Sequence, residues 1–240
     1  MKMTQKLCRF CIDIIYPNRC PCCGEFIVWN ELICSECAGK VRIDTDSLCR
    51  KCGKAKEDCI CTGKLMYDEA AAISYYEDEA KTGLIAMKNS VSRNFGWYAG
   101  IEIGSWIMTQ PEWMKCDGIV PVPMSRSKKM LRGYNQADII AKGICDVTGI
   151  PLMKDCIIKK HSRQEQHTLG AKERAENVYS FIPAGRDLDG KRLIICDDII
   201  TTGSTINRCA EILKDCGAEK VYAAAAAVTV RKREEQDGSN

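Results

Sequence analysis

The sharpest change in hydrophobic pattern along the chain lies near its C-terminal end. Leu193 to Cys196 form a continuous apolar run, which is typical of a strand buried on both faces of a parallel sheet. From Ile206, apolar residues recur at helical spacing, and Gly217 is placed to end the helix. A turn of small hydroxyl residues separates the two. The pattern predicts a strand, a turn and a helix in direct succession.

The same patterns recur upstream and predict an α/β fold with a parallel sheet flanked by helices. Apolar runs predict strands over 70–76, 117–122, 156–159 and 221–230. Helical spacing predicts helices over 2–16, 84–88, 95–109 and 136–144. Residues 124–132 are predicted to form a loop, and Lys88 is predicted to be a solvated charge at a helix end.

Two polar segments lack a clear period. Residues 160–177 form a long polar insert, which is typical of a flexible functional loop or of disorder. Residues 231–240 form a charged tail that is expected to be disordered. Neither segment is expected to contribute to the core.

The composition of the chain indicates the cellular compartment in which it is expected to act. The chain has 240 residues, a net charge of +3 and 17 cysteines. That charge is too small to indicate a nucleic-acid partner by itself. The N-terminal apolar stretch is interrupted by charges and lacks a cleavage site, and no apolar run reaches the length of a membrane span. The chain is therefore expected to be cytoplasmic, where clustered Cys-x-x-Cys pairs favour metal ligation over disulfides.

The cysteine pairs predict two zinc ribbons within an N-terminal segment, residues 1–64. A Cys-x-x-Cys turn places two thiolates on one side of a bend, and two such turns complete a tetrahedral site. About forty residues are too few to fold on their own core, so metal would supply the missing stability. The expected ligand sets are Cys20, Cys23, Cys34 and Cys37 for the first site, and Cys49, Cys52, Cys59 and Cys61 for the second.

The number of structural zinc ions is one or two on this pattern. Cys59 and Cys61 are one residue closer than a usual pair, so the second site is the weaker prediction. Cys22 is a spare thiol that could compete for the first site. An iron–sulfur cluster is the alternative that spacing leaves open.

A phosphate site is predicted where the 193–196 strand ends. Asp197 and Asp198 follow the strand, and the hydroxyl-rich turn precedes a helix N-terminus, whose N–H groups and dipole favour anions. The carboxylates would repel a phosphate but can accept hydrogen bonds from neutral hydroxyls. A ligand with one phosphate beside a diol, such as a ribose 5-phosphate, satisfies both parts. The alternative is an ordinary strand–turn–helix whose aspartates cap the turn.

This stretch resembles the phosphoribosyl pyrophosphate (PRPP) motif of the type I phosphoribosyltransferases. The resemblance implies that Asp197 and Asp198 hold the 2′- and 3′-hydroxyls of the ribose. It implies that the 5′-phosphate is wrapped by Thr201, Thr202, Gly203, Ser204 and Thr205. It also implies Mg²⁺, bound together with PRPP.

The basic 124–132 segment resembles the pyrophosphate loop of the same enzymes. The residues assigned to that loop are Pro123, Met124, Ser125, Arg126 and Arg132. The string Arg132-Gly133-Tyr134-Asn135-Gln136 follows and opens the next helix. The alternative is a solvated basic loop without a ligand.

Taken together, these blocks resemble the ComF family, from about residue 16 to residue 230. The shared features are the cysteine-rich segment, the Val-Pro-Val-Pro strand end, the Arg-Gly-Tyr-Asn-Gln string, the loop residues Gln166, Leu169, Arg174 and Asn177, and the Asp-Asp/Thr-Thr-Gly core. The resemblance implies a type I phosphoribosyltransferase-like domain over 65–230 behind the double zinc ribbon. It also implies a link to DNA uptake in natural competence, with competence-machinery proteins as partners.

Two functional classes follow from the resemblance. In the first, the chain binds PRPP or a related phosphoribosyl compound, and as an enzyme it would transfer the phosphoribosyl group to a nitrogen nucleophile as pyrophosphate leaves. Fold and motif alone do not establish that activity. In the second, a zinc-ribbon competence factor binds single-stranded DNA through its basic loops, with Trp29 or Tyr134 as stacking surfaces and a regulatory or vestigial PRPP site.

Overall fold

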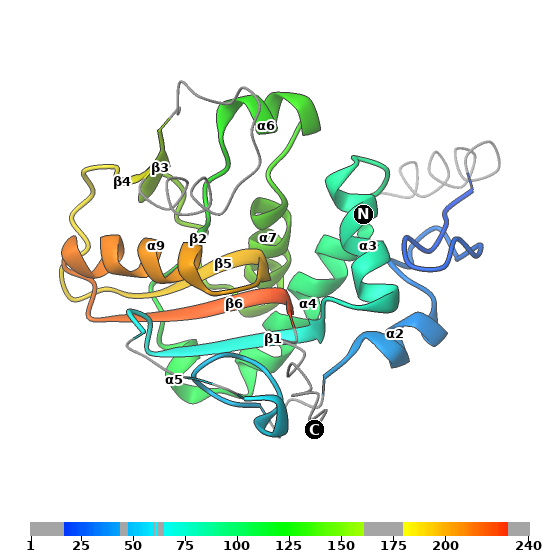
Figure 1. Cartoon of the computed structure of the whole chain (residues 1–240), viewed down its shortest axis with the longest axis horizontal. Helices are drawn as coiled ribbons and strands as arrows, with labels where there is room; N and C mark the ends of the chain where they lie inside the picture. The colour runs from blue at the N-terminus through cyan, green and yellow to red at the C-terminus, as the bar shows by residue number, and fades with distance from the viewer. Residues whose placement is uncertain (1–16, 44–47, 60, 62–64, 161–179, 230–240) are drawn as a thin grey trace, which may run out of the picture.

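A four-stranded parallel sheet forms the centre of the molecule (Figure 1). The computed structural model describes residues 17–43, 48–59, 61, 65–160 and 180–229. The strands, in spatial order, are β1 (Glu69–Tyr75), β6 (Lys220–Val228), β5 (Arg192–Ile200) and β2 (Gly118–Pro121). A parallel bridge between Ile119 and Leu152 continues the sheet beyond β2. The predicted α/β class with a parallel sheet is confirmed.

Helices cover both faces of this sheet. Helix α4 (Asn94–Met108) packs against β1 and β6, and α7 (Gln136–Thr148) packs beside it against β5 and β2. Helix α9 (Ser204–Asp215) packs against β5 and β6. The step from β5 to β6 crosses the sheet in the opposite direction from the step from β1 to β2, so right-handed connections place α9 on the face opposite α4. Figure 1 shows the two layers.

The core owes its tight spacing to small side chains. Ala223 to Ala227 of β6 are fully buried between β1 and β5, which leaves room for helices on both faces. In the helix layer formed by α4 and α7, a side chain at Gly100 of α4 would place its Cβ 2.3 Å from the carbonyl oxygen of Ile140 in α7. Gly143 of α7 faces Gly100 in return. The two helices therefore touch backbone to backbone.

The cysteine-rich segment packs along the β1 edge of the sheet. It contains α2 (Ser35–Val41) and the short 3-10 helix η2 (Lys56–Asp58). The Ile43 N–H donates to the Ile73 carbonyl at 2.7 Å, and Gly53 forms a parallel bridge with Ala71. This segment thus shares backbone hydrogen bonds with the sheet. The domain boundaries expected at residues 64 and 230 stay a prediction.

Three predicted elements differ from the structure. Residues 126–132 form helix α6 (Arg126–Arg132) instead of a loop, because Ser125 Oγ accepts the Lys128 N–H at 3.4 Å and Gly133, with φ of 75°, ends the helix. Strand β5 continues through both aspartates instead of ending before them. The strand expected near residue 156 is β3 (Ile157–Lys159), which pairs antiparallel with β4 (Phe181–Pro183) outside the main sheet.

The remaining helices link β1 to β2. They are α3 (Asp78–Lys88) and α5 (Pro111–Met114). Several predicted features lie outside the described residues: the helix over 2–16, the polar insert after residue 160 with Gln166, Leu169, Arg174 and Asn177, and the tail over 231–240. Within the described part of the chain, every helix is too short or too polar to cross a bilayer.

Candidate functional site

Asp197 and Asp198 lie at the carboxyl end of β5, the strand that carries the predicted motif. Asp197 pairs in register with Ala225 of β6, and its Oδ1 accepts the backbone N–H of Asp198 at 2.8 Å. Burial raises the pKa of Asp197 well above its usual value, and repulsion from Asp198 raises it further. Two neighbouring carboxylates repel each other when both are ionised. A hydroxyl donor, a cation or a bound proton relieves that repulsion.

The turn after β5 is rich in hydroxyl groups and leads directly into helix α9. Gly203 adopts a φ of 76°, a left-handed conformation that allows the chain to turn directly into α9 at Ser204. Thr202 Oγ1 and Ser204 Oγ lie 2.8 Å apart. Thr201 is exposed, and Thr205 faces a cavity beside the aspartates. The first N–H groups of a helix lack partners within the helix, and that of Ser204 donates to Thr202 Oγ1 at 3.4 Å.

That cavity unites the two segments that the sequence assigned to one ligand. Its described lining includes both aspartates and Thr205 on one side and the end of β2 with the start of α7 on the other. Of the predicted pyrophosphate-loop residues, Pro123, Met124, Ser125 and Arg132 line it. Arg126 is exposed on α6 and does not line the cavity.

The start of α7 fixes the pyrophosphate-loop side of the cavity. Asn135 Nδ2 donates to the Val122 carbonyl at 2.9 Å and so ties the α7 N-terminus to the end of β2. Gln136 is 1% exposed and lines the cavity. Both polar atoms of its side-chain amide are buried without a hydrogen-bond partner among the described residues. Asn135 and Gln136 belong to the Arg-Gly-Tyr-Asn-Gln string, but no sequence pattern assigns either residue to a ligand.

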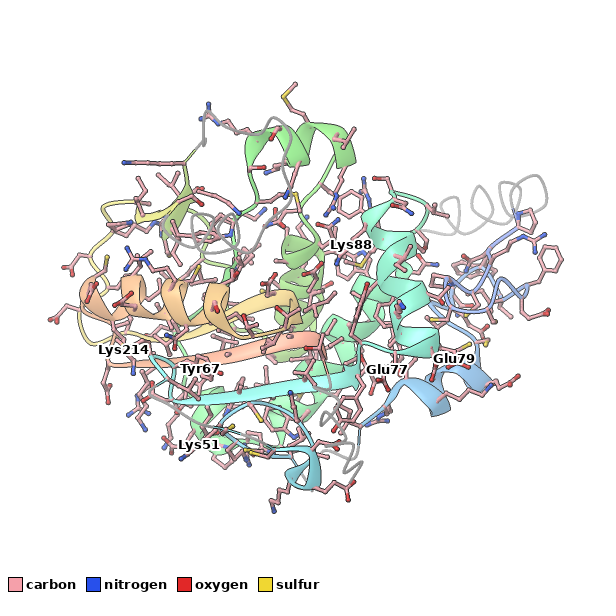
Figure 2. All side chains as sticks on the ribbon, in the orientation of Figure 1. Lys51, Tyr67, Glu77, Glu79, Lys88 and Lys214 are labelled. Atoms are coloured by element: carbon pink, nitrogen blue, oxygen red, sulfur yellow. The ribbon has the colours of Figure 1, made fainter. Side chains whose placement is uncertain are left out.

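Lys88 was wrongly predicted to be a solvated charge. Its Nζ lies 3.6 Å from Asp198 Oδ2 and 5.5 Å from the centre of the Tyr76 ring. Lys88 ends α3 and projects toward the carboxyl end of β5 (Figure 2). No sequence pattern predicts this position, because it depends on how α3 packs in the folded protein.

The cavity carries an excess of positive charge. The charged side chains among its described lining residues are the two aspartates and four bases, Lys88, Lys128, Arg132 and Lys159. Lys159 of β3 lies with its Nζ 4.8 Å from the ring centre of Phe181 in β4, and both residues line the cavity. The two-stranded β3–β4 sheet therefore supplies another wall of the same site. An anionic ligand with hydroxyl groups matches this combination.

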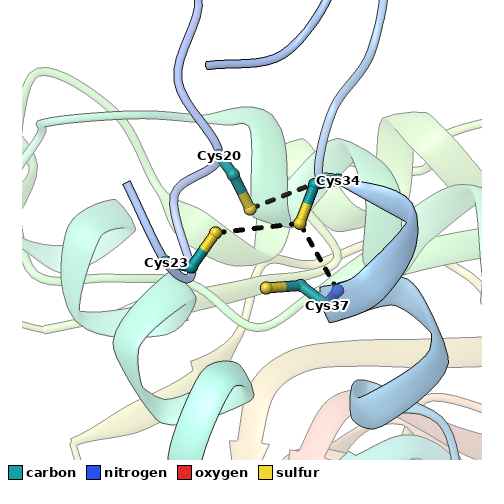
Figure 3. Close-up of side chains that lie close together, drawn as sticks. All are labelled: Cys20, Cys23, Cys34 and Cys37. Carbon is teal, nitrogen blue, oxygen red and sulfur yellow. Dashed lines mark hydrogen bonds between the residues drawn. The ribbon is translucent and has the colours of Figure 1, made fainter. Parts of the chain in front are cut away.

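The first cysteine cluster has the geometry of a metal site (Figure 3). The sulfurs of Cys20, Cys23, Cys34 and Cys37 lie within 4.8 Å of one another. The backbone N–H of Cys34 donates to Cys20 Sγ, and that of Cys37 donates to Cys34 Sγ, both at 3.4 Å. Zinc bonds to sulfur of ~2.3 Å in a tetrahedron put neighbouring sulfurs ~3.8 Å apart, so four thiolates here fit zinc.

The second cluster assembles in spite of its irregular spacing. The sulfurs of Cys49, Cys52, Cys59 and Cys61 also lie within 4.8 Å of one another, with Cys49 and Cys61 at 3.9 Å. Gly53, with φ of 73°, forms the tight turn after the second ligand. The one-residue separation of the last pair therefore does not prevent four sulfurs from meeting. Two clusters of this kind support structural zinc in the N-terminal segment.

In each cluster one thiol has a lowered pKa, whereas the pKa is raised at the other thiols with a shift, which are Cys23, Cys37, Cys52 and Cys61. Burial opposes ionisation of Cys20, but N–H groups of Cys34, Cys23 and Cys22 outweigh it and lower the pKa of Cys20 to about 7. At Cys49, burial is again outweighed, there by hydrogen bonds from neighbouring thiols and backbone, and the pKa falls to about 7. Cys22 is buried outside the first cluster, and that burial raises the pKa of its thiol. Cys22 is thus not one of the four sulfurs that meet in the first cluster.

The structure excludes one of the two predicted stacking surfaces. Tyr134 is only 7% exposed, and its hydroxyl donates to the carbonyl of Met87. The guanidinium of Arg93 covers its ring at 4.5 Å. Trp29 is partly exposed. Tyr134 thus acts as a packing residue between α3 and α7.

Comparisons with known proteins match both parts of the chain. A phosphoribosyl transferase domain model matches residues 132–239, and a double zinc ribbon domain model matches residues 11–69. Competence protein F of Haemophilus influenzae is 31% identical over 108 residues, which cover 44% of this chain and 47% of that protein. Competence protein ComFC of Streptococcus pneumoniae is 25% identical over 196 residues, which cover 80% of this chain and 86% of that protein.

Among solved structures, the chain is similar to glutamine PRPP amidotransferase from B. subtilis in complex with ADP and GMP. The TM-score is 0.37 with 20% identity, over 58% of this chain and 26% of that one. The match to competence protein F spans about half of that relative's length. The two domain matches and the competence-protein relatives match the ComF family that the sequence resembles, with a phosphoribosyl transferase domain model and a double zinc ribbon domain model over successive parts of the chain.

Proposed function

We propose that the cavity at the carboxyl end of β5 binds PRPP or a related phosphoribosyl compound together with Mg²⁺. The observation that carries this proposal is the meeting of Asp197 and Asp198, Thr205 and four basic side chains around one cavity. Carboxylates suit a diol, and cations with a helix start suit phosphates. A phosphoribosyl diphosphate presents both groups on one small molecule.

Each part of the ligand then has a matching part of the site. Asp197 and Asp198 accept hydrogen bonds from the ribose 2′- and 3′-hydroxyls. The turn formed by Thr201, Thr202, Gly203, Ser204 and Thr205 donates to the 5′-phosphate. Pro123, Met124, Ser125 and Arg132 border the diphosphate. Mg²⁺ prefers oxygen ligands and is held chiefly through substrate phosphates, and it neutralises the charge of the departing diphosphate.

Transfer is the second part of the proposal. In that reaction the bond between ribose C1 and the diphosphate oxygen breaks, the diphosphate leaves with the bonding electrons, and a nitrogen nucleophile forms the new bond to C1 and loses its proton to solvent or a base. Screening nucleobases and amines for pyrophosphate release tests this step separately from binding. A chain that binds PRPP but releases no pyrophosphate would have a regulatory site.

The cellular role is proposed from the relatives. Proteins matched to this chain are described as competence proteins and as DNA utilization proteins. We place the chain in DNA uptake during natural transformation, acting in the cytoplasm with proteins of the competence machinery. Clustered free cysteines suit that reducing compartment. Deleting the gene and scoring transformation with a selectable marker tests the role, and unchanged transformation would contradict it.

Helix α6 favours a second candidate function, the binding of single-stranded DNA. The helix carries Arg126, Lys128, Lys129 and Arg132 and no acidic residue, and Met130 and Leu131 are each 85% exposed. Cations bind phosphates, and exposed apolar side chains can pack on unstacked bases. Fluorescence polarisation with a labelled single strand would show affinity that falls steeply with salt. Replacing Lys128 and Lys129 by Gln should reduce that slope.

A thermal-shift titration tests the phosphoribosyl site. A ligand that binds only the folded state raises the melting temperature in proportion to the logarithm of its concentration above Kd. Mg²⁺–PRPP should stabilise the zinc-loaded wild type and leave the double variant Asp197→Asn/Asp198→Asn unmoved. Equal stabilisation of both proteins would contradict the assignment of the aspartates.

A further inference from the structure

Lys88 is the only basic residue that α3 contributes to the described lining of the cavity. It belongs to no part of the phosphoribosyl motif and reaches the site through the packing of α3. Its side chain is 29% exposed, and that of Asp198 is 19% exposed, so their 3.6 Å contact is partly shielded from water. A lysine beside the carboxylates that are proposed to bind the ribose hydroxyls can form an ion pair with an anionic group of the ligand other than its 5′-phosphate.

The end of α3 is fixed against the Arg132–Asn135 corner by two hydrogen bonds. The Tyr134 hydroxyl donates to the carbonyl of Met87, immediately before Lys88. Ser90 Oγ donates to the carbonyl of Arg132 at 2.8 Å. Ser90 itself adopts a φ of 60°, a conformation that non-glycine residues rarely hold without such support. The backbone on either side of Lys88 is therefore tied to the Arg132–Tyr134 corner, whose Arg132 lines the same cavity as Lys88.

We propose that Lys88 binds the diphosphate of the ligand, and that it makes the site selective for a phosphoribosyl diphosphate over a ribose 5-phosphate. This inference rests on the proposed function. In the free protein, Asp198 is the partner of the ammonium group. When the ligand binds, the ribose hydroxyls occupy the aspartates and the ammonium group turns to the diphosphate oxygens beside Arg132.

The cysteine-rich segment contacts the helix that carries Lys88. Lys40 of α2 lies 3.2 Å from Glu79 in the first turn of α3, and α2 carries Cys37 of the first cluster. Lys88 ends the same helix. The position of the proposed diphosphate residue is thus set at one end of α3 by the cysteine-rich segment and at the other by Tyr134.

Calorimetry with two ligands tests the proposal. Lys88→Met should weaken Mg²⁺–PRPP binding by about tenfold or more, because a charge-assisted bond to phosphate is lost. It should change the affinity for ribose 5-phosphate by about twofold or less on the same reasoning. Lys81→Met, on the exposed side of α3, is the matched control and should leave both affinities unchanged. Lys88→Arg should restore most of the affinity for PRPP.

Three outcomes would overturn the assignment. Equal losses for both ligands would show that Lys88 acts on the ribose end. A loss of PRPP affinity in Lys88→Arg as large as that in Lys88→Met would show that a cation at this position does not bind the diphosphate. Wild-type protein that binds neither ligand would overturn the proposed function itself, and the Lys88 assignment with it. Melting curves of each variant exclude loss of fold as the cause.

Discussion

The hydroxyl of Tyr134 donates a hydrogen bond to the backbone carbonyl of Met87, and this bond joins α7's N-terminal corner to the last turn of α3. Tyr134 lies in the Arg-Gly-Tyr-Asn-Gln string, whereas Met87 belongs to a helix with no motif at all. The contact gives Tyr134 a packing role within a segment that we propose borders the ligand. It orders the backbone from which Lys88 projects.

Replacing Tyr134 by Phe is expected to cost about 1 kcal/mol in the free energy of unfolding, the usual net value of one hydrogen bond. Affinity for Mg²⁺–PRPP should also fall, because the backbone that carries Lys88 loses one of the hydrogen bonds that hold it in place. Urea unfolding and calorimetry measure the two effects. Tyr222→Phe is the control, since its hydroxyl has no hydrogen bond within the described ranges, and it should change neither quantity. Equal behaviour of the two variants would contradict the role of Tyr134.

Close packing of α4 on α7 depends on Gly100. Its Cβ would lie 2.3 Å from the Ile140 carbonyl oxygen and 2.8 Å from Gly143 Cα, so Gly100→Ala must push the helices apart. We expect a loss of about 1–3 kcal/mol in the free energy of unfolding, as for other overpacked cores. Gly39→Ala in α2, where a Cβ meets nothing within 4 Å, should be neutral or stabilising. A tolerated Gly100→Ala would show that the two helices are not so tightly packed.

Two zinc ions per chain are expected from the two cysteine clusters. Elemental analysis of the purified protein should give two equivalents of zinc and no iron. Cys23→Ser and Cys61→Ser should each reduce the content to one, because three thiolates hold zinc less firmly than four. Cys22→Ala, outside both clusters, should keep two. One equivalent in the wild type would mean that the second cluster does not hold zinc.

Asp197 makes stability depend on pH. Its pKa is raised in the folded state, first by burial and then by Asp198, while the unfolded chain has the usual Asp value near ~3.9. The folded state therefore binds the proton more tightly. This contribution to stability is complete below the unfolded value and is lost as pH rises through the folded pKa.

Asp197→Asn stays neutral and escapes that loss. Its unfolding free energy minus that of the wild type should grow as pH rises from the usual Asp range, by at most about 1.4 kcal/mol per pH unit, and should level off above the raised pKa. Urea unfolding of both proteins between roughly pH 5 and 8 measures the difference. Parallel curves for the two proteins would contradict a raised pKa for Asp197.

The sequence predicted the elements that have a local pattern. The β5 strand, the turn at Gly203 and the α9 helix follow directly from apolar runs, a glycine and hydroxyl residues. The first cysteine cluster follows from two regular Cys-x-x-Cys turns. Each of these depends on residues that are neighbours in the chain, which is why they were predictable.

Other features were missed or were predicted less firmly. Lys88 looks like any helix-end lysine until the packing of α3 brings it beside Asp198. Helix α6 was predicted as a loop because its basic residues show no apolar stripe, although Ser125 and Gly133 are recognisable cap residues. The second cysteine cluster was predicted less firmly because Cys59 and Cys61 are too close in sequence for a regular turn. Only the folded backbone shows that their sulfurs meet.

The central claim is that Asp197 and Asp198 belong to a site for a phosphoribosyl diphosphate. The measurement that tests it most directly is calorimetric titration of Mg²⁺–PRPP into the zinc-loaded protein, beside the double variant Asp197→Asn/Asp198→Asn. The account predicts saturable binding of one ligand per chain in the wild type and no measurable binding in the double variant. Absence of heat in the wild type, or equal affinity in both proteins, would contradict it.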